Sequence, residues 1–243
     1  VEEAYQTNDS SAATIAQAMA TGALMGARGN SGVILSQIWR GLAQGLQGKK
    51  SFTGKELATA LQQASKMAYK GISNPVEGTI LTVIKDAAAA AQAKAKNDGE
   101  LISVMEAVVE AANESVANTP ALLPVLKEAG VVDAGGQGLF TILDGALRYL
   151  RGEAEQMQFR KPQIIASNIP QPVKLSRLVS LDEVPFGYCT EFLLKGEELN
   201  PDEIRTKLQK RGQSLIVVGD ETTARVHIHT LDPGSIIRYA TSL

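Results

Sequence analysis

Three short stretches of the chain combine glycine with small polar residues just before an apolar segment. They are GARGNSG at residues 26–32, NPVEGT at 74–79 and VVDAGGQG at 131–138. Because glycine has no Cβ, backbone N–H groups there can approach a ligand closely, and the first turn of a helix adds unpaired N–H donors and a positive dipole end. The combination favours binding of an anion, above all a phosphate group.

The same stretches also have an ordinary structural explanation. Glycine is common where helices end, Asn30 or Ser31 could serve only as N-caps, and Asp133 could cap the helix that follows it. One such loop alone would favour this explanation. Three loops of one kind favour a ligand site, provided that they meet at one end of the fold.

A second group of residues could bind a metal. Both histidines lie in the sequence HIH, as His227 and His229, and residues two apart on a strand point to the same face. The only cysteine, Cys189, lies in another predicted strand, and Glu191 shares its face. Two imidazoles and a thiolate suit Zn²⁺, with a fourth position for water or Glu191. The alternative is that the histidines are ordinary sheet residues and Cys189 a small core side chain.

Two regions of different periodicity must position these groups. Over residues 1–152 apolar residues recur at helical spacing, as in Leu57, Leu61 and Ala64, which predicts an all-α bundle of about seven helices. Thr53 and Glu56 form a capping box before one of them. From 153 to 184 the periodicity fades and prolines appear, which predicts an extended linker that could pair as an edge strand.

Residues 185–243 predict a second, smaller domain. FGYCTEFLLK alternates as a strand, and Asn200 and Pro201 open a helix as N-cap and first helical residue. Two strands then surround a turn at Gly219 and Asp220, and DPGSIIRYATSL opens a final helix. The order strand, helix, strand, strand, helix predicts a small open-faced α/β sandwich that lacks its last strand. The fold class is therefore multi-domain, a helical bundle followed by an α/β domain.

Topology decides whether the glycine loops can meet. In an up-and-down bundle the first and third connections lie at the same end, so 26–32 and 74–79 are expected to be neighbours. Parity alone would place 131–138 at the other end. However, PALLPVLKEAG, with Pro120 and Pro124, spans only about 15 Å at the helical rise, too short to cross the bundle. If this segment lies across the end, all three loops converge.

Composition narrows the classes of partner and compartment. The net charge is −2, so there is no basic field for nucleic acid or an anionic membrane surface. A single cysteine forms no internal disulfide, no apolar run approaches the roughly 20 residues of a membrane span, and the N-terminus is acidic. We therefore expect a cytoplasmic protein without membrane insertion. The first residues lack an initiator Met and the end stops within an amphipathic pattern, which suggests truncation at both ends.

Long motifs resemble a known family. GALMGARGNSGVILSQIWRG, NPVEGTILTVIKDA and LLPVLKEAGVVDAGGQGL resemble the ATP-binding subunits of bacterial fatty acid kinases, whose first domain is of the dihydroxyacetone kinase L-subunit type. FGYCTEFLL and VHIHTLDPG resemble their middle domain. The resemblance implies an eight-helix barrel that binds ATP and Mg²⁺ at one end. It also implies transfer of phosphate to an acyl group carried by a DegV-type fatty-acid-binding partner, for phospholipid synthesis.

The resemblance also implies roles for single residues. The matching motifs assign nucleotide binding to Gly29, Asn30, Ser31, Gly32, Gly78, Thr79, Asp133, Gly135 and Gly136. They assign a zinc site to Cys189, His227 and His229. One departure stands out, because the aspartate-rich stretch that holds Mg²⁺ in the family is absent and residues 1–9 offer only scattered acids. Catalytic residues therefore stay unassigned, and we expect this chain alone to be inactive.

Two other functions stay open. One is a non-catalytic docking module that binds phosphate or a nucleotide, and the other is a glycerone-type kinase subunit that uses a phosphocarrier. The missing aspartates favour the docking module for this chain, whereas the second domain favours the fatty acid kinase for its parent. The sequence does not indicate the acyl-chain preference, the identity of the partner or the oligomeric state, for which a homodimer is one option.

Overall fold

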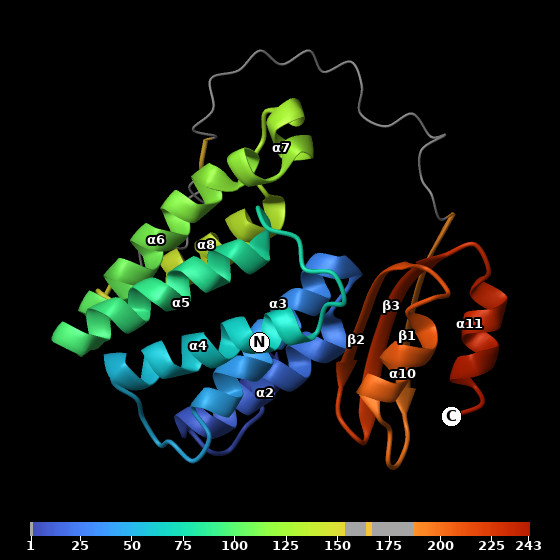
Figure 1. The fold of residues 1–243 in the computed structure, drawn as a ribbon. Coiled ribbons are helices and arrows are strands. Elements are labelled where there is room, and N and C mark those ends of the chain that lie inside the picture. Colours follow the sequence, from blue (N-terminus) through green and yellow to red (C-terminus); the bar gives the residue numbers. More distant parts are fainter. Residues whose placement is uncertain (1, 154–163, 167–186) are drawn as a thin grey trace.

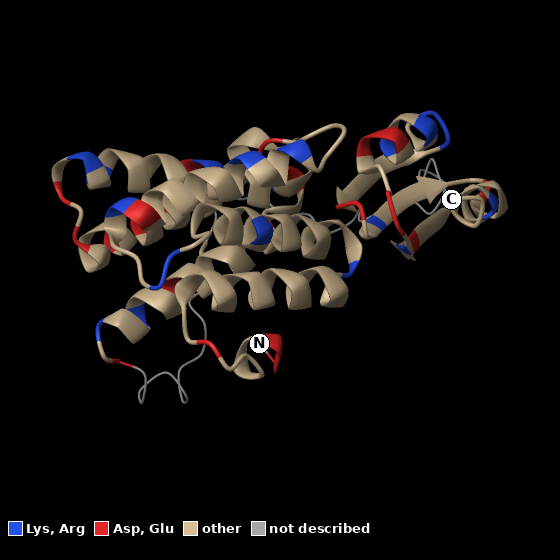
Figure 2. Ribbon diagram, turned by 90° about the horizontal axis from the view of Figure 1, so that it is seen from below, with Lys and Arg blue, Asp and Glu red and all other residues tan. Residues whose placement is uncertain are grey.

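The structure is a computed structural model that describes residues 2–153, 164–166 and 187–243 (Figure 1). The predicted linker, with its suggested edge strand, lies outside the described residues except at 153 and 164–166. Within the described residues, no helix is long and apolar enough to cross a membrane. Lys and Arg are interspersed with Asp and Glu over both parts of the molecule in the view of Figure 2.

The first part is helical, as the periodicity predicts. Its helices are α1 (Glu2–Tyr5), α2 (Ala12–Gly26), α3 (Gly29–Gly45), α4 (Gly54–Lys70), α5 (Ile80–Asn97), α6 (Leu101–Leu122), α7 (Pro124–Ala129) and α8 (Ala134–Leu150). The capping box of Thr53 and Glu56 at the start of α4 is confirmed. The count of about seven helices misses only the four-residue α1.

Small residues allow these helices to pack closely. Ala64 and Ala68 on α4 and Ala87 and Ala91 on α5 are all fully buried in the main core. Gly41 on α3 lies so close to α4 that a Cβ at this position would be 2.4 Å from Ala64 Cα. The backbones of α3 and α4 are therefore in near contact, which fixes the direction in which α3 begins.

The Gly41 contact predicts a large loss of stability when a methyl group is added. Gly41→Ala is expected to lower the free energy of unfolding by about 1–3 kcal/mol, because the obstructing atoms of Ala64 belong to the backbone and cannot turn away. Gly26→Ala is the control, since no atom lies within 4 Å of its added Cβ. Urea denaturation of both variants checks the prediction. Equal midpoints would show that α3 and α4 are not packed this tightly.

The second part is a three-stranded sheet with two helices. It comprises β1 (Tyr188–Lys195), α10 (Pro201–Leu208), β2 (Gln213–Gly219), β3 (Thr223–Thr230) and α11 (Pro233–Ala240). The strand order is β1-β3-β2 and both pairings are antiparallel. The predicted order of elements is confirmed, including the Asn200 cap on α10. One sheet face packs on α10 and α11 around Val226, Ile228 and Ile236.

The opposite face of the sheet lies against the helical part (Figure 1). Ile216 and Val218 of β2 are buried in a small cluster with Ala27 and Val33, at the start of α3. The guanidinium of Arg225 on β3 is buried and donates hydrogen bonds of 3.0 Å to the carbonyls of Ala27 and Met25. A cation near the carbonyl end of α2 is favoured by the helix dipole. The sheet is thus anchored beside the first glycine loop.

Candidate functional site

The first turns of α3, α5 and α8 meet at one end of the helical part. A Cβ built on Gly135 would lie 3.3 Å from both Ser31 Oγ and Ile80 Cβ, which belong to the other two helices. The chain returns from α6 through the short α7 at this same end, and the Asp133 N–H donates to Thr119 Oγ1 at 3.0 Å. The predicted convergence of the three glycine loops is therefore confirmed.

A cavity of about 210 Å³ lies at this meeting point. Its lining comes from α3, the loop before α5, the start of α5, Asp133 and strand β2: Asn30, Ser31, Ile34, Ile72, Asn74, Val76, Thr79, Ile80, Leu81, Asp133, Ser214, Leu215 and Ile216. Of the residues that the sequence nominates for a nucleotide, Asn30, Ser31, Thr79 and Asp133 line the cavity. No Lys or Arg does, so backbone amides and hydroxyls are its donors.

Two of the three helix N-termini are already satisfied by their own caps. The Thr79 side chain accepts from Leu81 N–H at the start of α5. The Asp133 carboxylate accepts from Gly136 N–H at 2.6 Å at the start of α8. Burial raises the pKa of Asp133, although hydrogen bonds from the Gly136, Ile80 and Gly135 amides act in the opposite direction. The capping role that the sequence left open for Asp133 is therefore confirmed.

The N-terminus of α3 differs from the other two. Its N-cap residue, Arg28, makes no capping hydrogen bond through its side chain, and Asn30 and Ser31 are exposed in its first turn. An uncapped first turn leaves N–H donors and the positive end of the dipole facing outward. The anion-binding capacity that the sequence assigns to three loops is therefore concentrated at the start of α3.

Several nominated glycines do not line the cavity, in contrast to the prediction. Gly136 gives its N–H to Asp133, and a Cβ at Gly136 would lie 2.8 Å from Val83 in the core. Gly78 has a φ of +81° and gives its N–H to Thr82 Oγ1. Gly32 packs against the backbone of Ala27. Their small size serves helix packing and turn geometry rather than access for a ligand.

Strand β2 supplies a wall of the cavity that sequence reasoning missed. Ser214 has a φ of +51°, which is unusual for a residue other than glycine, and lies at a register shift between Gln213 and Ile216. Ile216 also forms an isolated bridge to Ile72, after α4. No local pattern in the sequence could reveal this wall, because it depends on how the two parts dock.

The proposed metal ligands lie on the same sheet face, beside this cavity. Antiparallel pairing places Cys189 opposite His229 and Glu191 opposite His227. One ligand atom from each of Cys189, His227 and His229 lies within 4.8 Å of the others, and Cys189 Sγ is 3.8 Å from His227 Nδ1. Cys189 is exposed, so the alternative of a core cysteine is wrong. Nitrogen and sulfur donors this close together fit Zn²⁺.

The environment of this cluster agrees with metal binding. His227 is buried and its Nε2 has no hydrogen-bond partner, whereas Nδ1 faces Cys189 and Glu191. Burial and the nearby His227 lower the pKa of His229, which keeps its ring neutral and able to ligate at pH 7. Burial and the Glu191 charge raise the pKa of the Cys189 thiol, so a metal would have to displace its proton.

Glu191 connects the cluster to the glycine loop. Its Oε1 lies 2.7 Å from His227 Nδ1 and accepts a hydrogen bond of 2.8 Å from Gly29 N–H. Burial acts to raise the pKa of Glu191, but the hydrogen bonds from His227 and Gly29 lower it. The amide of Gly29, which the sequence nominates for phosphate, is thus already used by a carboxylate from β1.

Magnesium ligands are not evident in this part of the chain. Among the residues that the structure describes, Cys189, His227 and His229 are the only group of three or more His, Cys, Asp or Glu close enough to share a metal. Asp133 is the sole carboxylate that lines the cavity, and it is committed to capping α8. The described residues therefore do not provide the set of carboxylates that the family resemblance requires.

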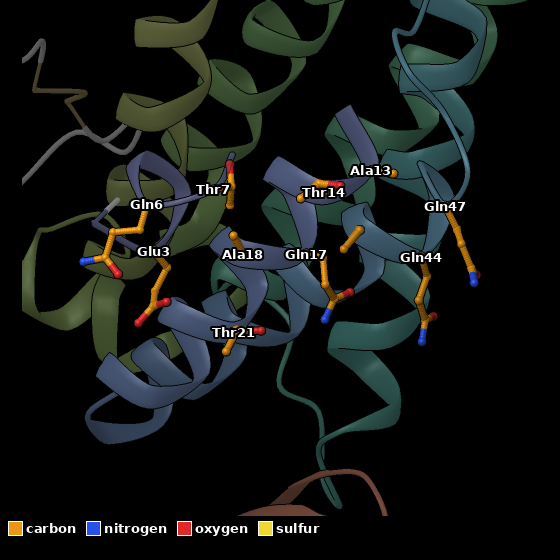
Figure 3. Close-up of a pocket in the computed structure, with 11 residues that line it drawn as sticks. Glu3, Gln6, Thr7, Ala13, Thr14, Gln17, Ala18, Thr21, Gln44 and Gln47 are labelled. Atoms are coloured by element: carbon orange, nitrogen blue, oxygen red, sulfur yellow. The ribbon is translucent and has the colours of Figure 1, made fainter. Parts of the chain in front are cut away.

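A second, more open groove lies between α1, α2 and α3 (Figure 3). It has a volume of about 760 Å³ and is lined mainly by neutral polar side chains: Gln6, Thr7, Thr14, Gln17, Thr21, Gln44 and Gln47. The nearby N-terminus of α2 is capped by Ser11, which accepts from Thr14 N–H. This groove has no open helix N-terminus and is a weaker candidate for an anion.

Comparison with known proteins agrees with the two-part organisation. Residues 1–148 match the DAK2 domain, and residues 185–243 match the FakA-like middle domain of fatty acid kinase. Protein YloV of Bacillus subtilis is 41% identical over 243 residues, which cover 98% of this chain and 44% of the relative. The uncharacterized protein SAB1090 of Staphylococcus aureus is 41% identical over 225 residues, covering 90% of this chain and 40% of the relative.

The chain thus spans less than half the length of these curated relatives. The DAK2 match covers most of the helical part, including the three helix N-termini that meet at the cavity. The other match covers the sheet that carries the Cys/His cluster. On the extent of these matches and the agreement in domain order, the chain belongs to the DAK2 domain family.

Proposed function

We propose that the chain is the nucleotide-binding part of a two-component fatty acid kinase. In this reaction a carboxylate oxygen of a fatty acid, carried by a DegV-type binding protein, attacks the γ-phosphorus of ATP, and acyl phosphate and ADP are formed. The observation that carries the proposal is the uncapped N-terminus of α3 at the cavity shared by both parts. The kinase-related domain matches support the reaction class.

The residues of the cavity have distinct parts in this proposal. Backbone N–H groups of the first turn of α3 and the Ser31 hydroxyl would hold phosphate oxygens, since no Lys or Arg lines the cavity. Thr79 and Asp133 keep the neighbouring helices in place through their caps. Cys189, His227 and His229 would hold Zn²⁺, which supplies a Lewis-acidic position for a substrate or partner carboxylate.

A docking module that binds nucleotide without catalysis is the second candidate. One specific observation favours it: the described residues offer no set of carboxylates for Mg²⁺. Phosphoryl transfer depends mainly on positioning and on charge neutralisation by metal, so a chain without these ligands loses the main catalytic contribution. Both candidates require nucleotide binding at the start of α3.

Nucleotide binding is tested by titration calorimetry with ATP, ADP, AMP and adenosine. We expect affinity to rise with the number of phosphates, because the open donors belong to a helix N-terminus. Adenosine is the matched control, since it carries the base and sugar without phosphate. Equal binding of adenosine and ADP, or no binding of any of the four, would contradict the proposed phosphate site.

The two candidates are separated by an acyl phosphate assay. The protein is mixed with ATP, Mg²⁺, a fatty acid and a DegV-type binding protein, and any acyl phosphate is trapped with hydroxylamine. We expect no product above the ATP-free control, because the described residues lack a magnesium-binding set. Product formation would show that this chain is itself catalytic and that acids outside the cavity, or outside the described residues, hold the metal.

A further inference from the structure

Glu191 lies between the two candidate sites and contacts both. The same oxygen, Oε1, is 2.7 Å from His227 Nδ1 and 2.8 Å from the backbone nitrogen of Gly29. The Glu191 side chain is only 20% exposed, and its partner across the strands is His227. A single carboxylate oxygen therefore joins the Cys/His cluster to the first residue of α3, although Glu191 and Gly29 are 162 residues apart in the chain.

The docking of the two parts holds this contact in place. Arg225, on the same sheet face, donates to the carbonyls of Met25 and Ala27, just before Gly29. Ile216 and Val218 of β2 pack against Ala27 from the same side. The chain that leads into α3 is thus fixed to the sheet on both sides of the Glu191 contact, so a shift of the carboxylate reaches the Gly29 amide.

We propose that Glu191 is a positioning residue that couples metal binding at Cys189, His227 and His229 to the conformation of the glycine loop at 26–32. The identity of the two ligands, Zn²⁺ and a nucleotide phosphate, rests on the proposed function. Nδ1 of His227 is the ring nitrogen that faces Cys189. A cation in the cluster takes the lone pair of Nδ1 in place of its proton, which leaves the Glu191 carboxylate against a positive charge while it still accepts from Gly29 N–H.

Coupling follows from this sharing of one acceptor. Residues that orient a metal ligand from outside the coordination sphere contribute about 10- to 100-fold to metal affinity. The same carboxylate also satisfies the first amide of α3, which leaves the amides that follow Gly29 directed toward the cavity. Fixing Glu191 with a cation therefore orders the turn at which phosphate is expected to bind.

The test uses Zn²⁺ alone as the probe and the whole chain, so it does not depend on nucleotide binding. Zinc affinity is measured by competition with a chromophoric chelator, and deuterium uptake is followed in peptides that cover residues 25–33. Glu191→Ala removes both contacts, Glu191→Gln keeps an acceptor oxygen without the charge, and Glu197→Ala changes an exposed acid of the same domain as a control.

We expect Glu191→Ala to weaken zinc binding by roughly 10- to 100-fold and Glu197→Ala to leave it unchanged. Zinc should lower deuterium uptake of 25–33 in the wild type and the control, but not in Glu191→Ala. Glu191→Gln should keep the wild-type uptake without metal, which separates the positioning role from misfolding. If zinc binds the wild type with no response in 25–33, or binds Glu191→Ala as tightly, the coupling is overturned and the metal site stands. If the wild type binds no zinc, both are overturned.

Discussion

Protein purified without chelators is expected to carry about one Zn²⁺ per chain, and His229→Ala is expected to lose it. The three proposed ligand atoms already lie within 4.8 Å of one another, so little rearrangement is needed to bind the ion. His229 is chosen because His227 is buried, and its replacement would disturb the sheet. Loss of a ligand should cost more affinity than the roughly 10- to 100-fold lost with an outer residue.

Metal analysis by plasma mass spectrometry checks this prediction. Lys195→Ala, an exposed change at the far end of β1, is the control and should retain zinc. Alkylation of Cys189 gives a second readout, because a zinc-bound thiolate should react more slowly than the thiol of the chelated protein. A correctly folded wild type that contains no metal and binds none when it is added would return the cluster to ordinary sheet residues.

Ser31→Leu is expected to weaken ADP binding by at least about tenfold, or roughly 1.4 kcal/mol. Ser31 is exposed in the uncapped first turn of α3 and lines the cavity, so a leucine there would cover the amides that are expected to bind phosphate. Ser31→Ala keeps those amides open and should cost no more than one hydrogen bond, about 1 kcal/mol.

The comparison of these two variants separates steric blocking from loss of the hydroxyl. Gln44→Leu, at an exposed position near the far end of the same helix, controls for a general effect of an added apolar side chain. Calorimetric titration with ADP and the Tm of each variant are measured together. Unchanged ADP affinity in Ser31→Leu would place the phosphates away from α3 and contradict the assignment of the cavity.

Local features of the fold could be predicted because they depend on residues close together in the chain. The capping box of Thr53 and Glu56, the Asn200 cap and the order of the strands follow from short patterns and are all confirmed. The convergence of the glycine loops could be predicted as well, because the segment after Pro120 is too short to cross the bundle.

The distribution of roles within the site could not be predicted. Three similar glycine loops predict three similar helix N-termini, yet Thr79 and Asp133 cap two of them and only α3 stays uncapped. Whether such a side chain turns onto its own helix or toward a ligand is decided by packing, which the pattern of residues does not contain. The same holds for Gly136, which serves the contact with Val83.

Contacts between the two parts also lay beyond sequence reasoning. Glu191 is recognisable from the sequence as a neighbour of Cys189, but its bond to Gly29 depends on the docking of β1 and β3 against the start of α3. The wall formed by Ser214 has the same origin. The structure thereby makes the nucleotide site and the metal cluster neighbours, where the sequence placed them in separate domains.

The central claim is that nucleotide phosphate binds where the uncapped N-terminus of α3 meets β2, and a crystal structure of the protein grown with ADP tests it most directly. The predicted result is phosphate density at the first turn of α3, next to Ser31 and within the cavity that Thr79 and Ser214 line. Density for the nucleotide in the polar groove between α1, α2 and α3 (Figure 3), with the cavity at α3 empty, would contradict it.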